Sequence, residues 1–178
     1  YSMREESKVN RSSGGAFGLS ADWRPGRWGV RVEYLKAALT PDVATHQAFT
    51  VTEFVGRLAY RIRPSLDAEV GISRRVIKPE FVTRDVGAVS VGIRSKGRLG
   101  RDAGVWARGA VLPLVRFNEG GSSGTFALEV GLGTWLSFLH DRARAELDYA
   151  MQRIDRRVQG VPLPLQTGIT RLGVSLRL

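Results

Sequence analysis

The segment RARAELDYAMQ, residues 142–152, places an apolar side chain at every second position, although most of its residues favour helices. On a helix, with 100° between successive residues, Leu147, Tyr149 and Met151 would scatter around the axis and bury no coherent face. On a strand these side chains share one face, and charged side chains occupy the other. Because the two-residue period accounts for the whole segment and helix propensity is only a weak prior, the pattern predicts a strand.

The same alternation recurs in eight further segments along the chain. They are residues 16–24, 27–35, 53–62, 67–76, 86–94, 103–111, 125–139 and 167–178. Most of them reach the roughly 9–11 residues that a tilted strand needs to cross a bilayer. Residues 2–9 alternate less regularly and supply a candidate tenth strand.

Prolines and turn residues separate these segments, with tight connections at 25–26, 64–65, 97–100 and 140–141 and mostly longer connections between the others. Short turns on one side and longer loops on the other are typical of an up-and-down meander. The sequence therefore predicts an all-β protein with a single domain, residues 1–178. We expect an antiparallel up-and-down transmembrane β-barrel, or a barrel segment, of about ten strands with short periplasmic turns and longer extracellular loops.

The polar faces of these strands decide which side of the barrel lies inside. A soluble, lipocalin-like binding barrel points its apolar face inward around a ligand, whereas a membrane barrel points it outward to lipid. Here the polar faces mix arginine, carboxylates and glycine, which favours a narrow ionic lumen because the guanidinium fork pairs with carboxylates and glycine leaves room for long side chains. The predicted lumen network comprises Arg31, Glu33, Glu53, Arg57, Arg61, Asp67, Glu69, Arg94, Asp102, Arg108, Glu129, Arg142, Arg144, Glu146, Asp148 and Arg171. Asp22 and Arg75 belong to the same polar faces.

Aromatic residues on the apolar faces gather near the tight turns. Trp23 and Trp28 flank the first turn, Tyr60 precedes the second and Phe138 precedes the fourth. Amphipathic rings at one height are typical of an aromatic girdle at a membrane interface, and the alternative is ordinary aromatic packing at the end of a soluble core.

Across nearly its whole length the chain resembles the outer-membrane β-barrel proteins of Gram-negative bacteria. Its last segment, TRLGVSLRL, is similar to the carboxy-terminal insertion signal of that class, although it ends in Leu178 where the class usually has an aromatic residue. The resemblance implies a location in the bacterial outer membrane and contact with its lipid, with lipopolysaccharide and with the barrel-assembly machinery. The resemblance also extends to the carboxy-terminal barrel part of exopolysaccharide-export or phage-adsorption proteins, which would imply a polysaccharide or a phage as partner, and no motif in the sequence distinguishes this alternative.

The net charge of +10 and the pI near 10.9 suggest a nucleic-acid partner at first sight. The positive charges are almost all arginine and are interleaved with carboxylates along the chain, not gathered in a basic tail or helix. We therefore expect no nucleic-acid partner. The absence of cysteine excludes disulfides and thiolate metal sites.

Catalytic chemistry has few candidates in this sequence. The two histidines are His46, in a predicted loop near Asp42, and His140, in a predicted turn beside Asp141. Turn formation and loop exposure explain both histidines, no cluster has metal-ligand spacing, and we expect neither a cofactor nor a metal. A rim-active outer-membrane hydrolase is the remaining enzymatic alternative to a non-enzymatic role.

Positive side chains also cluster at the outer strand ends, at a height where they could meet lipopolysaccharide phosphates. This predicted rim comprises Arg74, Lys78, Arg84, Arg153, Arg156 and Arg157, and Arg75 and Arg116 lie at the same strand ends. Solvated loop charge explains these residues equally well. The functional prediction is an integral outer-membrane barrel with a charged lumen that acts as a surface anchor, a receptor or adhesion protein, or a narrow export pore.

Overall fold

The computed structural model describes residues 2–7, 11–43, 47–79, 85–117, 122–138 and 143–176, and within these ranges the regular elements are all strands. The strands are β1 (Ser2–Ser7), β2 (Arg11–Trp23), β3 (Trp28–Pro41), β4 (Phe49–Arg63), β5 (Leu66–Lys78), β6 (Val86–Arg98), β7 (Ala103–Phe117), β8 (Ser122–Phe138), β9 (Ala143–Val158), β10 (Val161–Pro162) and β11 (Leu165–Leu176). Among the described residues, no helix is long and apolar enough to cross a membrane.

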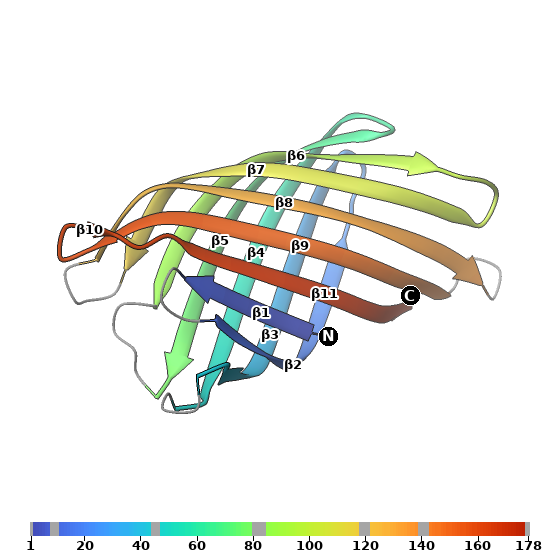
Figure 1. Ribbon diagram of the computed structural model, residues 1–178. Helices are drawn as coiled ribbons and strands as arrows, with labels where there is room; N and C mark the ends of the chain where they lie inside the picture. Colours follow the sequence, from blue (N-terminus) through green and yellow to red (C-terminus); the bar gives the residue numbers. More distant parts are fainter. Residues whose placement is uncertain are drawn as a thin grey trace.

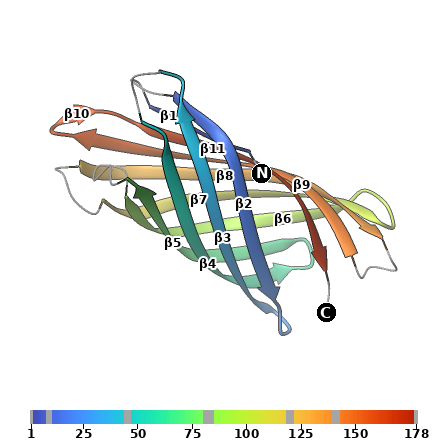
Figure 2. The same cartoon turned by 90° about the horizontal axis from the view of Figure 1, so that it is seen from below.

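Ten of these strands close into an antiparallel barrel. Neighbours in sequence pair from β1 to β9, β9 pairs with β11, and β11 pairs with β1, so the ring is complete. The two-residue β10 lies outside this ring and pairs with Arg157 and Val158 at the end of β9. Figures 1 and 2 show the strands curving around one common interior. The prediction of an up-and-down barrel of about ten strands is confirmed.

The connections define two ends of the barrel. At the turn end the chain passes from β2 to β3, from β4 to β5, from β6 to β7 and from β8 to β9, and at the loop end it passes from β1 to β2, from β3 to β4, from β5 to β6, from β7 to β8 and from β9 to β11. Strand β1 enters between β2 and β11 on the loop side, where Ser7 pairs with Leu165 and Ser2 pairs with Thr170.

Each predicted strand is present, and several run further toward the loop end than the alternation indicated. In β3 the inward positions change from charged to apolar, and Leu35, Ala37 and Leu39 are all buried. Because their outward neighbours are mixed, the contrast between the two faces disappears there and the period no longer marks the strand. Pro113 lies where the β6–β7 ladder shifts register between Val89 and Val91, a position where its missing N–H is tolerated.

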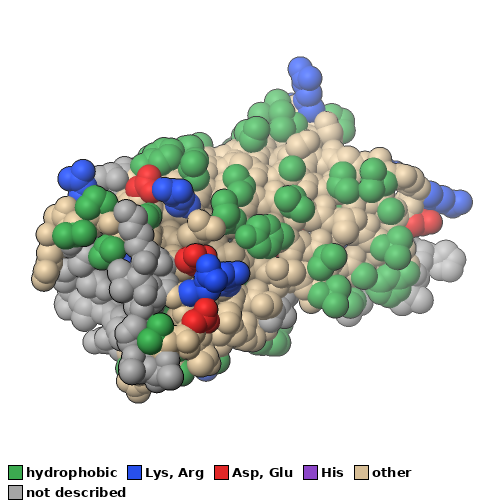
Figure 3. Space-filling view, viewed as in Figure 1, with side chains coloured by type: hydrophobic (Ala, Val, Ile, Leu, Met, Phe, Trp, Pro, Cys, Tyr) green, Lys and Arg blue, Asp and Glu red, His purple; other side chains and the backbone are tan. Residues whose placement is uncertain are grey.

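Along the strands, the apolar side chains that alternate with the inward polar side chains point out of the barrel. Leu132 on β8, Ile72 on β5 and Leu172 on β11 expose between 61% and 73% of their surface. Hydrophobic side chains are spread over the wall in Figure 3, and the charged side chains on this face gather toward the strand ends and around β1. This arrangement matches a barrel with lipid outside and contradicts a lipocalin-like barrel with an apolar binding interior.

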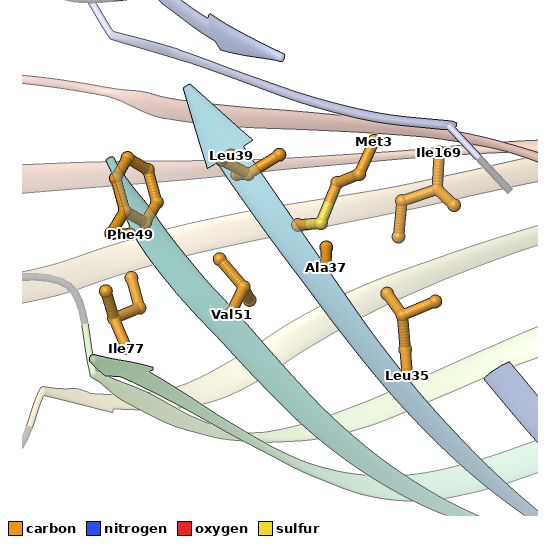
Figure 4. Close-up of a cluster of buried hydrophobic side chains, with 8 residues drawn as sticks. All are labelled: Met3, Leu35, Ala37, Leu39, Phe49, Val51, Ile77 and Ile169. Carbon is orange, nitrogen blue, oxygen red and sulfur yellow. The ribbon is translucent and has the colours of Figure 1, made fainter. Parts of the chain in front are cut away.

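The loop-side half of the interior is filled by two apolar clusters. The first, shown in Figure 4, comprises Met3, Leu35, Ala37, Leu39, Phe49, Val51, Ile77 and Ile169. The second comprises Val86, Ala88, Leu112, Ala127, Ile154 and Leu165. The expected charged lumen is therefore confined to part of the barrel, because apolar side chains pack across the remainder.

Candidate functional site

A cluster of cations around Asp67 lies at the turn end of the interior. Arg24 binds both carboxylate oxygens at 3.0 Å, Lys96 Nζ donates to Oδ2 at 2.8 Å, and Arg61 lies 4.0 Å away. Asp67 is 2% exposed, so its charge depends on these partners. Arg24 lies in the connection between β2 and β3, and its hydrogen bonds to Asp67 raise the pKa of the Arg24 guanidinium above its usual value.

A chain of ion pairs crosses the middle of the barrel. Arg108 on β7 donates from Nε to Glu69 on β5 at 2.6 Å and from Nη1 to Glu129 on β8. Arg57 on β4 joins Glu129 at 3.1 Å and Glu33 at 2.5 Å. Because charge-assisted hydrogen bonds of this kind connect five different strands through one chain of side chains, they fix the shape of the barrel interior at this height.

The chain continues to β11 on the other side of the ring. Arg171 Nη1 donates to Glu33 at 3.3 Å, and its Nε lies 3.9 Å from Asp148. A separate pair, Arg31 with Asp22 at 2.7 Å, is more exposed and closes no space.

Arg75 forms a second crossing, on the loop side and between the two apolar clusters. Arg75 is a residue of β5. Its Nη1 donates to Thr167 Oγ1 on β11 at 2.9 Å, and its Nη2 donates to Glu53 on β4 at 3.1 Å. Strands β5 and β11 are five positions apart in the ten-stranded ring, so this side chain reaches the opposite wall. With 2% of the Arg75 side chain exposed, water has almost no access at this height.

Two tryptophans on the polar faces line the interior with arginine. The Arg94 guanidinium lies 4.3 Å from the ring centre of Trp106, and that of Arg144 lies 4.7 Å from Trp135. Each ring rests on a glycine of the neighbouring strand, because Trp106 pairs with Gly133 and Trp135 with Gly104. A Cβ built at Gly133 would lie 2.7 Å from the Trp106 ring, and one at Gly104 would lie 2.4 Å from the Trp135 ring. Glycine is therefore required at both positions to accommodate the indoles.

Most of the predicted lumen residues lie in or beside these clusters. Two of them differ. Asp102 is exposed in the connection before β7, because the strand begins only at Ala103, and Arg142 lies outside the described residues. Glu146 accepts from the Ser175 hydroxyl at 3.4 Å on the turn side.

Lys96, Trp106, Trp135 and Arg24 line these interior clusters but are absent from the predicted lumen network. The inward orientation of Lys96 follows from the strand period, because Lys96 lies two positions after the inward Arg94 on β6 and therefore shares its face. Trp106 and Trp135 lie on faces already assigned to the interior, but their contacts with arginine have no sequence signal. Arg24 lies outside the strands, where alternation gives no orientation.

The predicted rim residues do not share one environment. Arg74, Lys78, Arg153 and Arg157 are exposed, and Arg153 lies 3.3 Å from Asp155. Arg156 is buried, because its position on β9 points inward, where it donates to the Leu163 carbonyl and lies over Phe117. Arg84 lies outside the described residues.

All four predicted girdle residues point outward near the turn end. Trp23, Trp28, Tyr60 and Phe138 are 37–68% exposed, and the rings of Trp28 and Tyr60 lie 4.9 Å apart. Both histidines fall outside the described residues. Within the described part, no group of three or more His, Asp or Glu side chains could hold a metal ion.

The charged side chains of the polar half lie close together around a small cavity. A cavity of about 10 Å³ lies among Asp22, Arg31, Arg57, Glu69 and Arg94, which is room for about one water molecule. A side chain that lines an open aqueous pore stays accessible to water, yet Glu69, Arg94 and Arg108 are each at most 8% exposed. The ion-pair chain, and Arg75 with the apolar clusters, therefore narrow the described interior at two heights.

Comparisons with known proteins give similar solved structures but no matching family or curated sequence. Among solved structures, the chain is similar to a "KdgM porin in complex with disordered oligogalacturonate", with 13% identity and a TM-score of 0.40 over 99% of this chain and 97% of that chain. At these values neither the pore nor the oligogalacturonate of that porin carries over to this barrel.

Proposed function

We propose that this chain is an integral β-barrel of the bacterial outer membrane that holds its loop-end surface at the membrane and keeps its lumen closed. In this role the outward apolar band and the aromatic girdle place the barrel in lipid. The side chains inside hold the wall in one shape and leave no route for solutes. The role is that of a surface anchor or receptor, and it needs no catalytic group.

The observation that carries this proposal is the Arg75 crossing. A permanent diffusion pore keeps its lumen hydrated, whereas here a guanidinium from β5 reaches Thr167 on the opposite wall and is almost completely buried. Met3 and Ile77 of the first apolar cluster are fully buried. Opening this height would separate the Glu53 carboxylate from the Arg75 guanidinium, at a cost of about 3–5 kcal/mol for a broken buried pair.

Conductance in a planar lipid bilayer tests the proposal. The purified full chain is refolded into detergent, and its insertion is checked by strand-dominated circular dichroism and by a heat-dependent shift of its mobility on a gel. A known general porin, reconstituted in parallel, controls for successful fusion. We expect the inserted barrel to show no stable conductance steps in 1 M KCl. Regular ohmic steps from the unmodified chain would refute the closed lumen.

A narrow gated pore is the second candidate, and the polar half of the interior favours it. The Nε–H groups of Arg57 and Arg94 and one Nη2 of Arg108 have no acceptor among the described residues, so this half suits small, mobile, hydrogen-bonding species. Such a pore would show rare, voltage-dependent steps in the same recordings. An anchor would show none at any voltage that the bilayer withstands.

A further inference from the structure

Two arginines flank a glycine on the outer wall near the loop end. Gly87 on β6 pairs with Arg74 on β5 and with Arg116 on β7, so the three residues form one row across three strands. Both arginines are exposed. Strands lie about 4.8 Å apart, which separates the two arginine backbones by roughly 10 Å and leaves a notch over Gly87.

The row lies at the loop-side border of the apolar band. On β7 the outward positions from Val105 to Leu114 are apolar or small, and Arg116 follows directly. At about 3.3 Å per residue and a tilt near 40°, these nine steps span roughly 23 Å along the membrane normal, close to the ~25 Å apolar band of such barrels. Arg116 therefore lies at the height of lipid headgroups.

The notch is part of a cavity of about 460 Å³. Arg74 and Arg116 line it on the two sides of Gly87, and Val89 and Leu114, which pair with each other in the next outward row toward the middle of the strands, also line it. A Cβ at Gly87 would meet only the Ser73 carbonyl, at 3.9 Å, so a side chain at this position would occupy the cavity without disturbing the wall. The cavity thus combines a cationic upper part with an apolar lower part.

The two guanidiniums have no carboxylate partner in the described structure. Asp85 also lines the cavity, but its Oδ1 accepts the Ile77 amide at 2.7 Å. Arg75 contributes to the lining while its guanidinium points into the lumen. The part of the cavity that faces outward therefore carries two unpaired positive charges and suits an anion with several acceptor oxygens.

We propose that this cavity binds a phosphorylated lipid of the outer leaflet. A phosphate accepts from Arg74 and Arg116 together over Gly87, and an acyl chain lies along Val89, Leu114 and the outward Ile72. The proposal depends on the membrane location proposed above and is independent of whether the lumen is closed.

Lipid retention by the detergent-solubilised full chain, measured by native mass spectrometry, tests the site. The probes are bis-phosphorylated lipid A and the same lipid without its phosphates. We expect the unmodified barrel to prefer the phosphorylated lipid, and we expect Arg74→Ser with Arg116→Ser to weaken that binding at least tenfold, as the loss of two charge-assisted hydrogen bonds implies. Gly87→Leu should weaken the binding of both lipids because its side chain fills the cavity.

Two matched variants control for indirect effects. Gly109→Leu adds the same side chain at an outward β7 position with no atom within 4 Å, and Arg153→Ser with Arg157→Ser removes two exposed arginines on β9. Both should bind lipid A like the unmodified barrel. Equal retention of the two lipids, or undiminished retention after Arg74→Ser with Arg116→Ser, would overturn the site. A chain that shows no heat-dependent mobility shift would instead refute the membrane barrel itself.

Discussion

At the scale of single residues, Arg108 is the cation on which a buried acid depends. Glu69 is 5% exposed and its ion-pair partner is Arg108, at 2.6 Å, whereas Glu129 also has Arg57. A charge removed from water is stable only while its partner stays, since desolvating a lone carboxylate costs several kcal/mol. The stability of this height of the barrel is therefore concentrated in one side chain.

We predict that Arg108→Met lowers the free energy of unfolding by about 3–5 kcal/mol because it leaves Glu69 buried and unpaired. The measurement is urea unfolding of the barrel in lipid vesicles. Adding Glu69→Gln to Arg108→Met should recover much of the loss. Arg31→Met, which breaks the exposed pair with Asp22, should cost less than about 1 kcal/mol. Equal losses for Arg108→Met and Arg31→Met would contradict the assignment.

At the scale of the element, the strands could be predicted from the sequence, but the contacts between their inward side chains across the barrel could not. Alternation identifies a strand whenever its two faces differ, which is why residues 142–152 could be assigned to a strand against their helix propensity. The same rule fails at Leu35–Leu39, where the inner face becomes apolar. Parity assigns Arg75 to the interior, but its contact with Thr167 depends on how the ring closes, and no local pattern encodes that closure.

The β7–β8 hairpin shows how a glycine shapes the interior. Gly133→Val should displace the Trp106 ring from Arg94, because the new Cβ would lie 2.7 Å from that ring and from the Asp148 Cβ. We predict a loss of about 1–3 kcal/mol of stability, as is usual for overpacking, together with a changed near-ultraviolet circular dichroism spectrum. Gly109→Val, in the same hairpin but with no atom within 4 Å, should change neither. The prediction fails if the two variants unfold at the same urea concentration.

At the scale of the whole molecule, the two closures lie in series along one barrel. Arg75 and the apolar clusters close the loop-side half, and the chain through Arg57 and Arg108 closes the turn-side half. Current through a tube is limited by its narrowest section. Removing one closure should therefore give a barrel without measurable conductance, even though the space opened at that height is large.

Truncating both closures together tests this arrangement. Arg75→Ala with Leu39→Gly, Ile77→Gly, Leu112→Gly and Ile154→Gly truncates Arg75 and both apolar clusters of the loop-side half, and Arg57→Ala with Arg108→Ala opens the turn-side half. We predict no stable conductance from either set alone and regular steps in a planar bilayer when both sets are combined. Each protein must first show the heat-dependent mobility shift of a folded barrel, so that silence reports a closed lumen and not a failure to fold. Steps from the turn-side set alone would show that Arg75 and its apolar neighbours form no seal, and that the ion-pair chain is the single barrier in this barrel.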